Sequence, residues 1–394
     1  MLKVTLRRNL IYPINLIIWE SMRKLISILI FNLFNFKGSL IYTFLMFLGE
    51  FIGGFILYKY QNNFVEGKHN LEKSLLKYKF PLIQEKSEMK REDNFKMIFI
   101  LLFITSFFDF FQFILSTYYI NKIPKISSTL EMRLGGTLII VSSLLYWYFL
   151  KFQLFRHQIF SLIIFGICVL LLIISEYFFQ EFNGIITIKD LTLAILFSIF
   201  SHISNSYHNI IEKYLIEFDF LNPFYILFIQ GSMGLIFSII CICIENPFQE
   251  IKSIYDNNSI EWFILFIFLF LLYYIFGTLK NIYRMPTIML FTPMNKHLAD
   301  IIINPLYIIY YFVVGQDFKT EGEKNYLYFF TNLIILIIFD ICGLIFNEFL
   351  ILYCCRLDHN TYITISNRAS KIEDSSISSE TDEGNDNVDN INFE

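Results

Sequence analysis

Polar and ionisable side chains recur at helical spacing inside three apolar segments of the 394-residue chain. One face of segment 97–121 carries Thr105, Asp109, Gln112 and Ser116. One face of segment 191–211 carries Ser198, Ser201, His202, Asn205 and Asn209 and leads to Glu212. Segment 285–316 carries Thr292, Lys296, Asp300 and Asn304. Charged groups inside apolar helices are costly, so they usually face a cavity or another helix. The stripes therefore predict a bundle around a shared hydrated cavity, or one joined by interhelical hydrogen bonds without a cavity.

The charged members of these stripes are the best suited to bind an ionic substrate or to carry a proton. Burial of Asp109, Lys296 or Asp300 favours a functional or an ion-paired role. Lys296 and Asp300 lie one turn apart and could simply neutralise each other. His202 could serve proton coupling or make an ordinary hydrogen bond. For Asn205, interhelical hydrogen bonding is the favoured interpretation.

An arginine opens a further apolar segment. Arg133 precedes Gly135-Gly136, and small residues allow helices to approach closely. A guanidinium at this place suits a phosphate or a carboxylate. Pairing with Glu131 or Glu50, or snorkelling to the nearby membrane interface, is an equally good explanation.

Composition places the chain in a bilayer. It is 55% apolar and only 17% charged, with a mean hydropathy of +0.54, which excludes an ordinary soluble domain. A span needs about 20 largely apolar residues. Charge-free stretches occupy 134–150, 157–175, 191–211, 220–244 and 262–279, and stretches with one or two charges occupy 38–58, 97–121, 285–316 and 325–355. A tenth candidate, 9–36, carries Glu20, Arg23 and Lys24 and either spans the membrane or lies on its surface.

Basic residues are unevenly distributed between the two sides of the predicted bundle. With ten spans, one side carries 18 Lys and Arg and the other carries 7, so the positive-inside rule places both termini in the cytoplasm. Residues 1–8 and the loop 60–94 then face the cytoplasm. So does the acidic tail 356–394, which we expect to be disordered from about residue 372. The sequon at Asn257 falls on the luminal or external side and is a candidate glycosylation site.

Short motifs follow in order along the chain: Met46-Phe47-Leu48-Gly49-Glu50, Asp109, Ser127-Ser128 with Arg133, Ile211-Glu212-Lys213-Tyr214, Asn222-Pro223 and Gln230-Gly231. Through them, roughly residues 38–355 resemble the drug/metabolite transporter superfamily, and within it the nucleotide-sugar-transporter-like F-subfamily of solute carrier family thirty-five. The resemblance implies an all-α polytopic membrane protein with about ten transmembrane helices in two inverted five-helix repeats, 9–179 and 190–355. A central substrate site would open alternately to each side.

These features predict a secondary transporter or exchanger of a small organic metabolite, with an anion of nucleotide-sugar type as the first hypothesis. The candidate substrate-binding residues are Arg133, Lys296, Asn205, His202 and Gln112, and the candidate proton-coupling or orienting residues are Glu50, Asp109 and Asp300. Export of cationic or amphipathic compounds, with the acids as binding groups, is one alternative. A non-transporting membrane scaffold is another.

Motifs for other chemistry are missing from the sequence. There is no Gly-x-x-x-x-Gly-Lys-Ser/Thr, so transport would use a gradient or exchange, and no His-Glu-x-x-His or Gly-x-Ser-x-Gly, so an enzyme is disfavoured. We expect no cofactor and no metal. The expected partners are a small-molecule substrate and the lipid bilayer, without nucleic acid, and a homodimer stays open. An endomembrane, Golgi or lysosome/vacuole, is favoured over the plasma membrane.

Overall fold

The fold is that of a computed structural model, which describes most of the chain between Ile11 and Leu350. The described residues are 11–36, 39–79, 94–119, 123, 129–151, 154–181, 187–219, 221–245, 248–257, 259–291, 293–314, 319–320 and 323–350. Residues 1–8 and the tail 356–394, to which the sequence assigns a cytoplasmic position, lie outside them. So do Ser127, Ser128 and Thr292.

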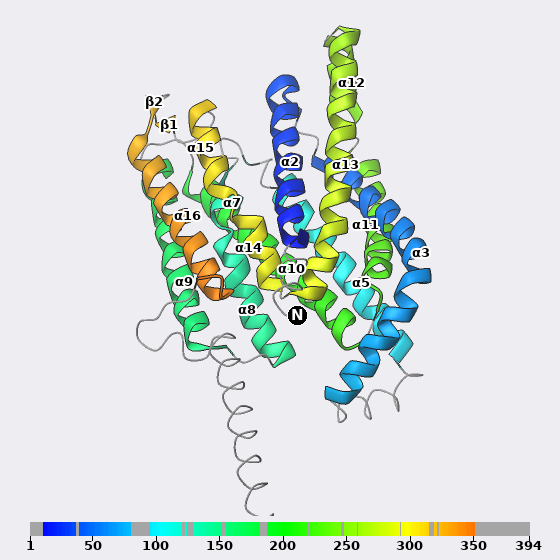
Figure 1. The fold of residues 1–394 in the computed structure, drawn as a ribbon. Coiled ribbons are helices and arrows are strands. Elements are labelled where there is room, and N and C mark those ends of the chain that lie inside the picture. The colour runs from blue at the N-terminus through cyan, green and yellow to red at the C-terminus, as the bar shows by residue number, and fades with distance from the viewer. Residues whose placement is uncertain are drawn as a thin grey trace, which may run out of the picture.

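The described chain is a bundle of helices (Figure 1). The α-helices are α2 (Ile11–Phe34), α3 (Ser39–Lys79), α5 (Asn94–Phe113), α7 (Leu130–Arg133), α8 (Gly136–Leu150), α9 (Arg156–Glu176), α10 (Ile188–Glu217), α11 (Pro223–Glu245), α12 (Phe248–Asn257), α13 (Ile260–Leu290), α14 (Pro293–Ile301), α15 (Asn304–Val314) and α16 (Tyr326–Phe346). Two π-helical turns, η1 (Ile114–Tyr119) and η2 (Tyr177–Glu181), extend α5 and α9. A short antiparallel hairpin joins β1 (Lys319–Thr320) to β2 (Glu323–Lys324).

Seven helical segments in the described part of the chain are long and apolar enough to cross a membrane. They begin at Leu40, Lys96, Arg156, Pro223, Ile260, Pro293 and Tyr326. The chain is therefore a predominantly helical, multi-pass membrane protein. The shorter apolar helix α8 and the more polar helices α2 and α10 pack into the same bundle.

Local sequence accounts for several helix starts. Pro223 and Pro293 stand at the first positions of α11 and α14, where the missing backbone N–H of proline carries no cost. The side chain of Thr187 accepts a hydrogen bond from the backbone of Asp190 at 3.2 Å, and that of Asn325 accepts one from Tyr328 at 3.0 Å. These contacts cap α10 and α16.

The helices differ from the predicted spans in length. α3 continues to Lys79, well into the predicted loop 60–94, and α13 continues to Leu290, through the predicted loop at 278–285. The predicted luminal loop 245–259 contains α12, which lies with the β1–β2 hairpin at one end of the bundle, at the top of Figure 1. Lys280 and Arg284 therefore belong to a helix, which corrects their assignment to a cytoplasmic loop.

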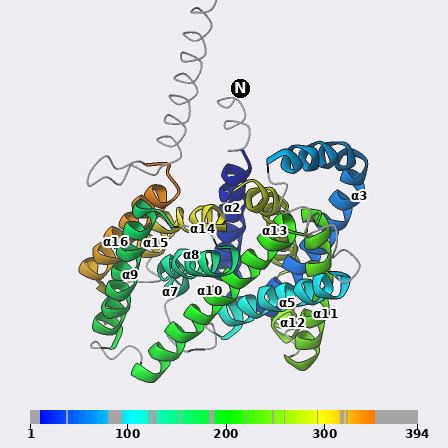
Figure 2. The same ribbon diagram turned by 90° about the horizontal axis from the view of Figure 1, so that it is seen from below.

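Helix pairs form the two edges of the bundle. α9 and α16 lie side by side at one edge, and α3 and α11 at the other (Figures 1 and 2). Phe165 and Phe339 join the first pair with ring centroids 5.6 Å apart. Met46 of α3 is buried in a separate apolar cluster with Phe266 of α13, close to α2. Apolar packing thus surrounds a polar centre.

Candidate functional site

Two of the helices are broken, and their breaks meet. Leu134 and Gly135 form a turn between α7 and α8, and Ile302 and Ile303 form one between α14 and α15. The Asn304 side chain donates a 2.9 Å hydrogen bond to the carbonyl of Met132, a backbone group just before the first break. Non-helical backbone at membrane depth occurs where it is buried in protein or lines a water-filled cavity.

Five ionisable residues from four helices form a buried group, which we call the Arg284 cluster: Glu50 (α3), Asp109 (α5), His208 and Glu212 (α10), and Arg284 (α13). The Arg284 guanidinium Nη2 lies 3.1 Å from Glu212 Oε1 and 3.5 Å from Glu50 Oε1. His208 Nε2 lies 3.2 Å from Glu212 Oε1 and 3.8 Å from Asp109 Oδ1. The side chains of all three acids are at most 1% exposed. Three carboxyl groups therefore surround a single guanidinium.

Neutral side chains complete the surroundings of this cluster. Gln230 of α11 donates to Thr105 Oγ1 at 3.3 Å and accepts from Arg284 at 3.4 Å. Gln112 donates to Asp109 Oδ1 at 2.7 Å, so two of the residues that the sequence placed on one stripe do meet. Asp109 Oδ2 and Glu50 Oε2 have no hydrogen-bond partner among the described residues.

A second group lies between α2 and α13, and we call it the Lys280 cluster: Glu20, Arg23, Lys24 and Lys280. The Glu20 carboxylate forms ion pairs with Arg23 at 2.8 Å, Lys280 at 3.2 Å and Lys24 at 3.7 Å. Arg23 also donates to the Tyr273 hydroxyl at 2.8 Å. The side chains of the three cations remain 12–16% exposed although they face the inside of the bundle.

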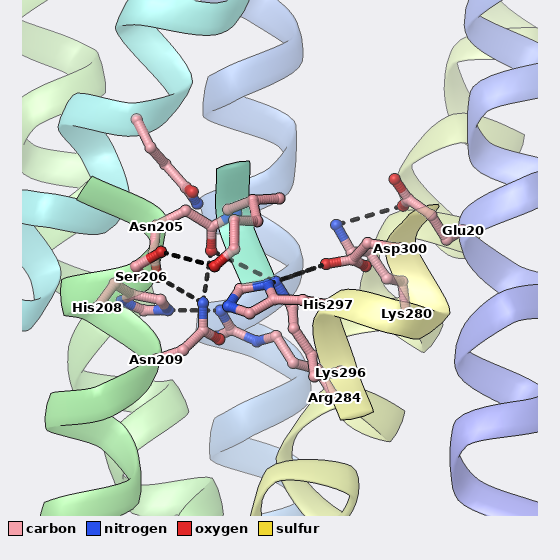
Figure 3. A network of polar contacts seen from close by, with 12 residues as sticks. Glu20, Asn205, Ser206, His208, Asn209, Lys280, Arg284, Lys296, His297 and Asp300 are labelled. Carbon is pink, nitrogen blue, oxygen red and sulfur yellow. Dashed lines mark hydrogen bonds and ion pairs between the residues drawn. The ribbon is translucent and has the colours of Figure 1, made fainter. Parts of the chain in front are cut away.

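Lys296 and Asp300 of α14 connect the two clusters. Lys296 pairs with Asp300 at 2.7 Å and donates to Asn205 Oδ1 of α10 at 3.4 Å. Asn209 donates to the same oxygen at 2.5 Å. Figure 3 shows the polar side chains of α10 turned toward those of α14, with Lys280 and Glu20 beside Asp300. The predicted stripes on α10 and α14 thus face each other.

Arg133 lies in a different place, between α7, α9 and α16. It forms a buried ion pair with Glu176 of α9 and donates to the Tyr328 hydroxyl at 2.7 Å and to Asn332 at 3.2 Å. The structure therefore pairs Arg133 with an acid other than the two that the sequence suggested. Lys296, its predicted companion at the substrate, makes its ion pair within α14 and its hydrogen bond to α10.

The remaining predicted residues hold neighbouring helices together or fall at the edge of the described chain. His202 of α10 hydrogen-bonds Thr137 of α8. Asn257 ends α12, but its side chain lies outside the described residues.

Sequence reasoning missed several central residues. Lys280 and Arg284 were assigned to a loop because the span was ended at the first charge, although their spacing of four places them on one helical face. Glu20 and Arg23 were treated only as obstacles to insertion, yet their charges point into the bundle. His208 lies three residues after Asn205 and one turn before Glu212, so helical spacing places it on the same face of α10, although it was not counted there. Its contact with Asp109 of α5 could not be foreseen without the fold.

The motif residue Lys213 has a structural role. Its ammonium group donates to the carbonyls of Ile288, Met289 and Phe291 at 2.8–3.1 Å, at the end of α13. These carbonyls have no partner further along the helix. Lys213 therefore fixes the end of α13 next to Glu212, which contacts Arg284 of the same helix.

The site is built from side chains of its own chain. Within the described ranges, no group of three or more His, Cys, Asp or Glu is arranged to hold a metal ion. The polar centre instead offers paired charges, amides and a histidine from the helices α2, α3, α5, α10, α13 and α14. Searches against protein-family models and against curated proteins gave no match to the chain.

Proposed function

We propose that the protein is a secondary transporter or exchanger that moves a small organic anion across a membrane by alternating access. The Lys280 cluster together with Lys296 carries this proposal. Arg23, Lys24, Lys280 and Lys296 converge from α2, α13 and α14, and the side chains of the first three stay 12–16% exposed while that of Lys296 is buried. Ionisable groups in that setting are functional candidates by default.

The charge balance around these four cations favours an anion. Glu20 and Asp300 are their direct ion partners. Glu131, which accepts a 3.3 Å hydrogen bond from Ser201, is a third acid within electrostatic reach of Lys24. The four cations therefore outnumber their two direct ion partners. Guanidinium and ammonium groups with spare donors suit a carboxylate or a phosphate.

Helix packing supports the proposal of two inverted repeats. We pair α2 with α10, α3 with α11, α5 with α13, α8 with α14 and α15, and α9 with α16. Several helix contacts then have a counterpart in which both helices are replaced by their equivalents. The contact α2–α13 corresponds to α10–α5, and α3–α13 corresponds to α11–α5. The contact α8–α10 corresponds to α14–α2. The pairs α3–α11, α9–α16 and α8–α14 map onto themselves. Ten successive crossings would make the two halves antiparallel.

Close contacts between α3 and α11, which are equivalent helices in the proposed repeats, are reciprocal. A Cβ on Gly54 of α3 would lie 2.6 Å from the backbone nitrogen of Phe228 in α11. A Cβ on Gly231 of α11 would in turn lie 2.7 Å from Cα of Phe51 in α3. Each helix thus provides a glycine where the other helix touches it, as expected for tightly packed membrane helices.

The proposed orientation places both termini in the cytoplasm and α12 in the lumen or outside. Lys213, Lys280 and Arg284 are buried or half-buried in helices, so they leave the count of loop charges. The remaining Lys and Arg still number 15 against 7, which keeps the direction that the positive-inside rule assigns. An endomembrane location rests on the family resemblance.

A second candidate function is export of a cationic compound. The Arg284 cluster favours it, because its three buried acids outnumber its single guanidinium. A cation entering there would neutralise the excess. The side chains of these acids are closed off, however, whereas those of the Lys280 cluster are partly accessible.

Uptake into liposomes tests the proposal. Purified protein is reconstituted and offered labelled inorganic phosphate, succinate and uridine diphosphate sugars in one panel, and choline and tetraethylammonium in the other. We expect saturable uptake in the anion panel, weakened about tenfold or more by Lys280→Gln or Lys296→Gln. The exposed Lys252 of α12 supplies the control, Lys252→Gln. Uptake confined to the cations would favour the second candidate.

A further inference from the structure

His208 joins the acids of the Arg284 cluster to its guanidinium. Its Nδ1 lies 3.1 Å from the carbonyl oxygen of Thr105, so Nδ1 carries the hydrogen and donates it. Its Nε2 lies 2.6 Å from Arg284 Nη1 and 3.2 Å from Glu212 Oε1. The ring therefore supplies at most one positive charge to the cluster.

The cluster therefore holds too much negative charge for its burial. If Glu50, Asp109 and Glu212 were all ionised, these three acids would outnumber Arg284 even if His208 were also charged, although their side chains are at most 1% exposed. A buried and unpaired carboxylate takes up a proton instead. Oxygens without a hydrogen-bond partner among the described residues occur on all three acids. Of these, Glu50 Oε2 and Asp109 Oδ2 belong to the acids that lie farther from the guanidinium than Glu212 does, and they are the places for the proton.

We propose that the Arg284 cluster binds an exchangeable proton, which Glu50 and Asp109 share. Glu212 stays ionised, because it is the acid nearest the guanidinium, at 3.1 Å against 3.5 Å for Glu50. Glu50 Oε1 lies 3.5 Å from Arg284 Nη2 and Asp109 Oδ1 lies 3.8 Å from His208 Nε2, so both acids approach the same buried guanidinium and imidazole. One proton on either of them removes the excess negative charge.

The next charged groups around the pair come from neighbouring helices. α13 contributes Lys280 in addition to Arg284, and α14 contributes Asp300. α10 contributes His208 and Glu212, and α11 contributes the neutral Gln230. Lys280 and Arg284 lie one turn apart on α13, so this helix joins the proton site to the Lys280 cluster.

The link through α13 predicts how proton binding affects anion binding, and this step rests on the proposed function. A proton on Glu50 or Asp109 removes a negative charge near Lys280 and so makes the anion site more positive. Anion and proton would then bind together, and by linkage each would raise the affinity of the other by about fivefold or more. The transporter would be a proton–anion symporter.

Infrared difference spectroscopy tests the proton site without any substrate. The full-length protein is titrated, and the C=O band of protonated carboxyl groups is recorded for wild type, Glu50→Gln, Asp109→Asn and Glu217→Gln, whose acid is 43% exposed. We expect a band at neutral pH that is smaller in the first two variants than in wild type, since each leaves two acids beside Arg284, and unchanged in the third. Where Glu50→Gln fails to fold, Asp109→Asn decides. A band retained in full by both variants, or absent from wild type, would overturn the proposal.

Liposomes with an imposed pH gradient test the coupling. With succinate and phosphate as probes, an acidic exterior should raise accumulation in wild type. In Glu50→Gln, accumulation of the probe should no longer respond to the gradient. Accumulation in Glu50→Gln that follows the gradient as in wild type would refute the coupling. Absence of exchange in wild type would count against the anion transporter and leave the infrared result standing.

Discussion

The Lys280 ammonium of α13 lies 3.2 Å from the Glu20 carboxylate of α2. The charged first helix is therefore accommodated by a helix that comes some 250 residues later in the chain. Charges in the middle of a span oppose its insertion, and their partners are available only after α13 has been made. We predict that isolated 9–36 inserts poorly in a translocon assay and that the full chain carries it across. Efficient insertion of the isolated segment would contradict this.

Glu20 should be essential for folding because it faces three cations. Glu20→Gln leaves Arg23, Lys24 and Lys280 without their common partner and should destabilise the protein by about 3–5 kcal/mol. Adding Lys280→Gln should recover part of the loss. Thermal unfolding in detergent measures both variants, and a double variant no more stable than Glu20→Gln would show that the two residues are not coupled.

The Arg133–Glu176 pair should matter for stability and not for transport. Arg133→Gln should lower the melting temperature, because it removes the guanidinium that forms an ion pair with the buried Glu176. Glu176→Gln in the same chain should restore much of the stability. Transport normalised to folded protein should then survive in the double variant. Loss of anion affinity at unchanged stability would instead place Arg133 at the substrate, as the sequence alone suggested.

The sequence predicts the helical bundle well because apolar length and polar spacing are local properties. It places Asp109 and Gln112 on one helix face and offers a Lys296–Asp300 pair as one of two interpretations, since these contacts lie within one helix. Partners from distant helices, such as Glu176 for Arg133 and Arg284 for Glu50, depend on packing that no single segment encodes. Helix ends were also misplaced where charges continue a buried face, as at Lys280.

Substitution of a glycine by alanine tests the close contact of α3 and α11. Gly231→Ala would push a Cβ into the backbone of Phe51 and should cost about 1–3 kcal/mol of stability. Gly166→Ala is the matched control, because no atom lies within 4 Å of the added Cβ in α9. Melting temperatures of the two variants should therefore differ clearly. Equal values would mean that the helices separate more easily than the structure indicates.

Glycosylation tests the orientation. In a translation system with microsomes, Asn257 should receive a glycan, whereas a sequon engineered into 60–94 should not, because the basic side of the bundle faces the cytoplasm. Mobility shifts removed by a glycosidase report both sites. A glycan on the engineered site alone would show that the orientation is the reverse of the one proposed.

Counterflow is the most direct measurement of the central claim that the Lys280 cluster serves anion transport by alternating access. Liposomes loaded with an unlabelled anion are diluted into a trace of the same labelled anion, without any pH gradient. The account predicts transient accumulation of label, strongly reduced in Lys280→Gln and Lys296→Gln and unchanged in Lys252→Gln. Label that enters the wild type no faster than protein-free liposomes, or that enters both Gln variants at the wild-type rate, would contradict it.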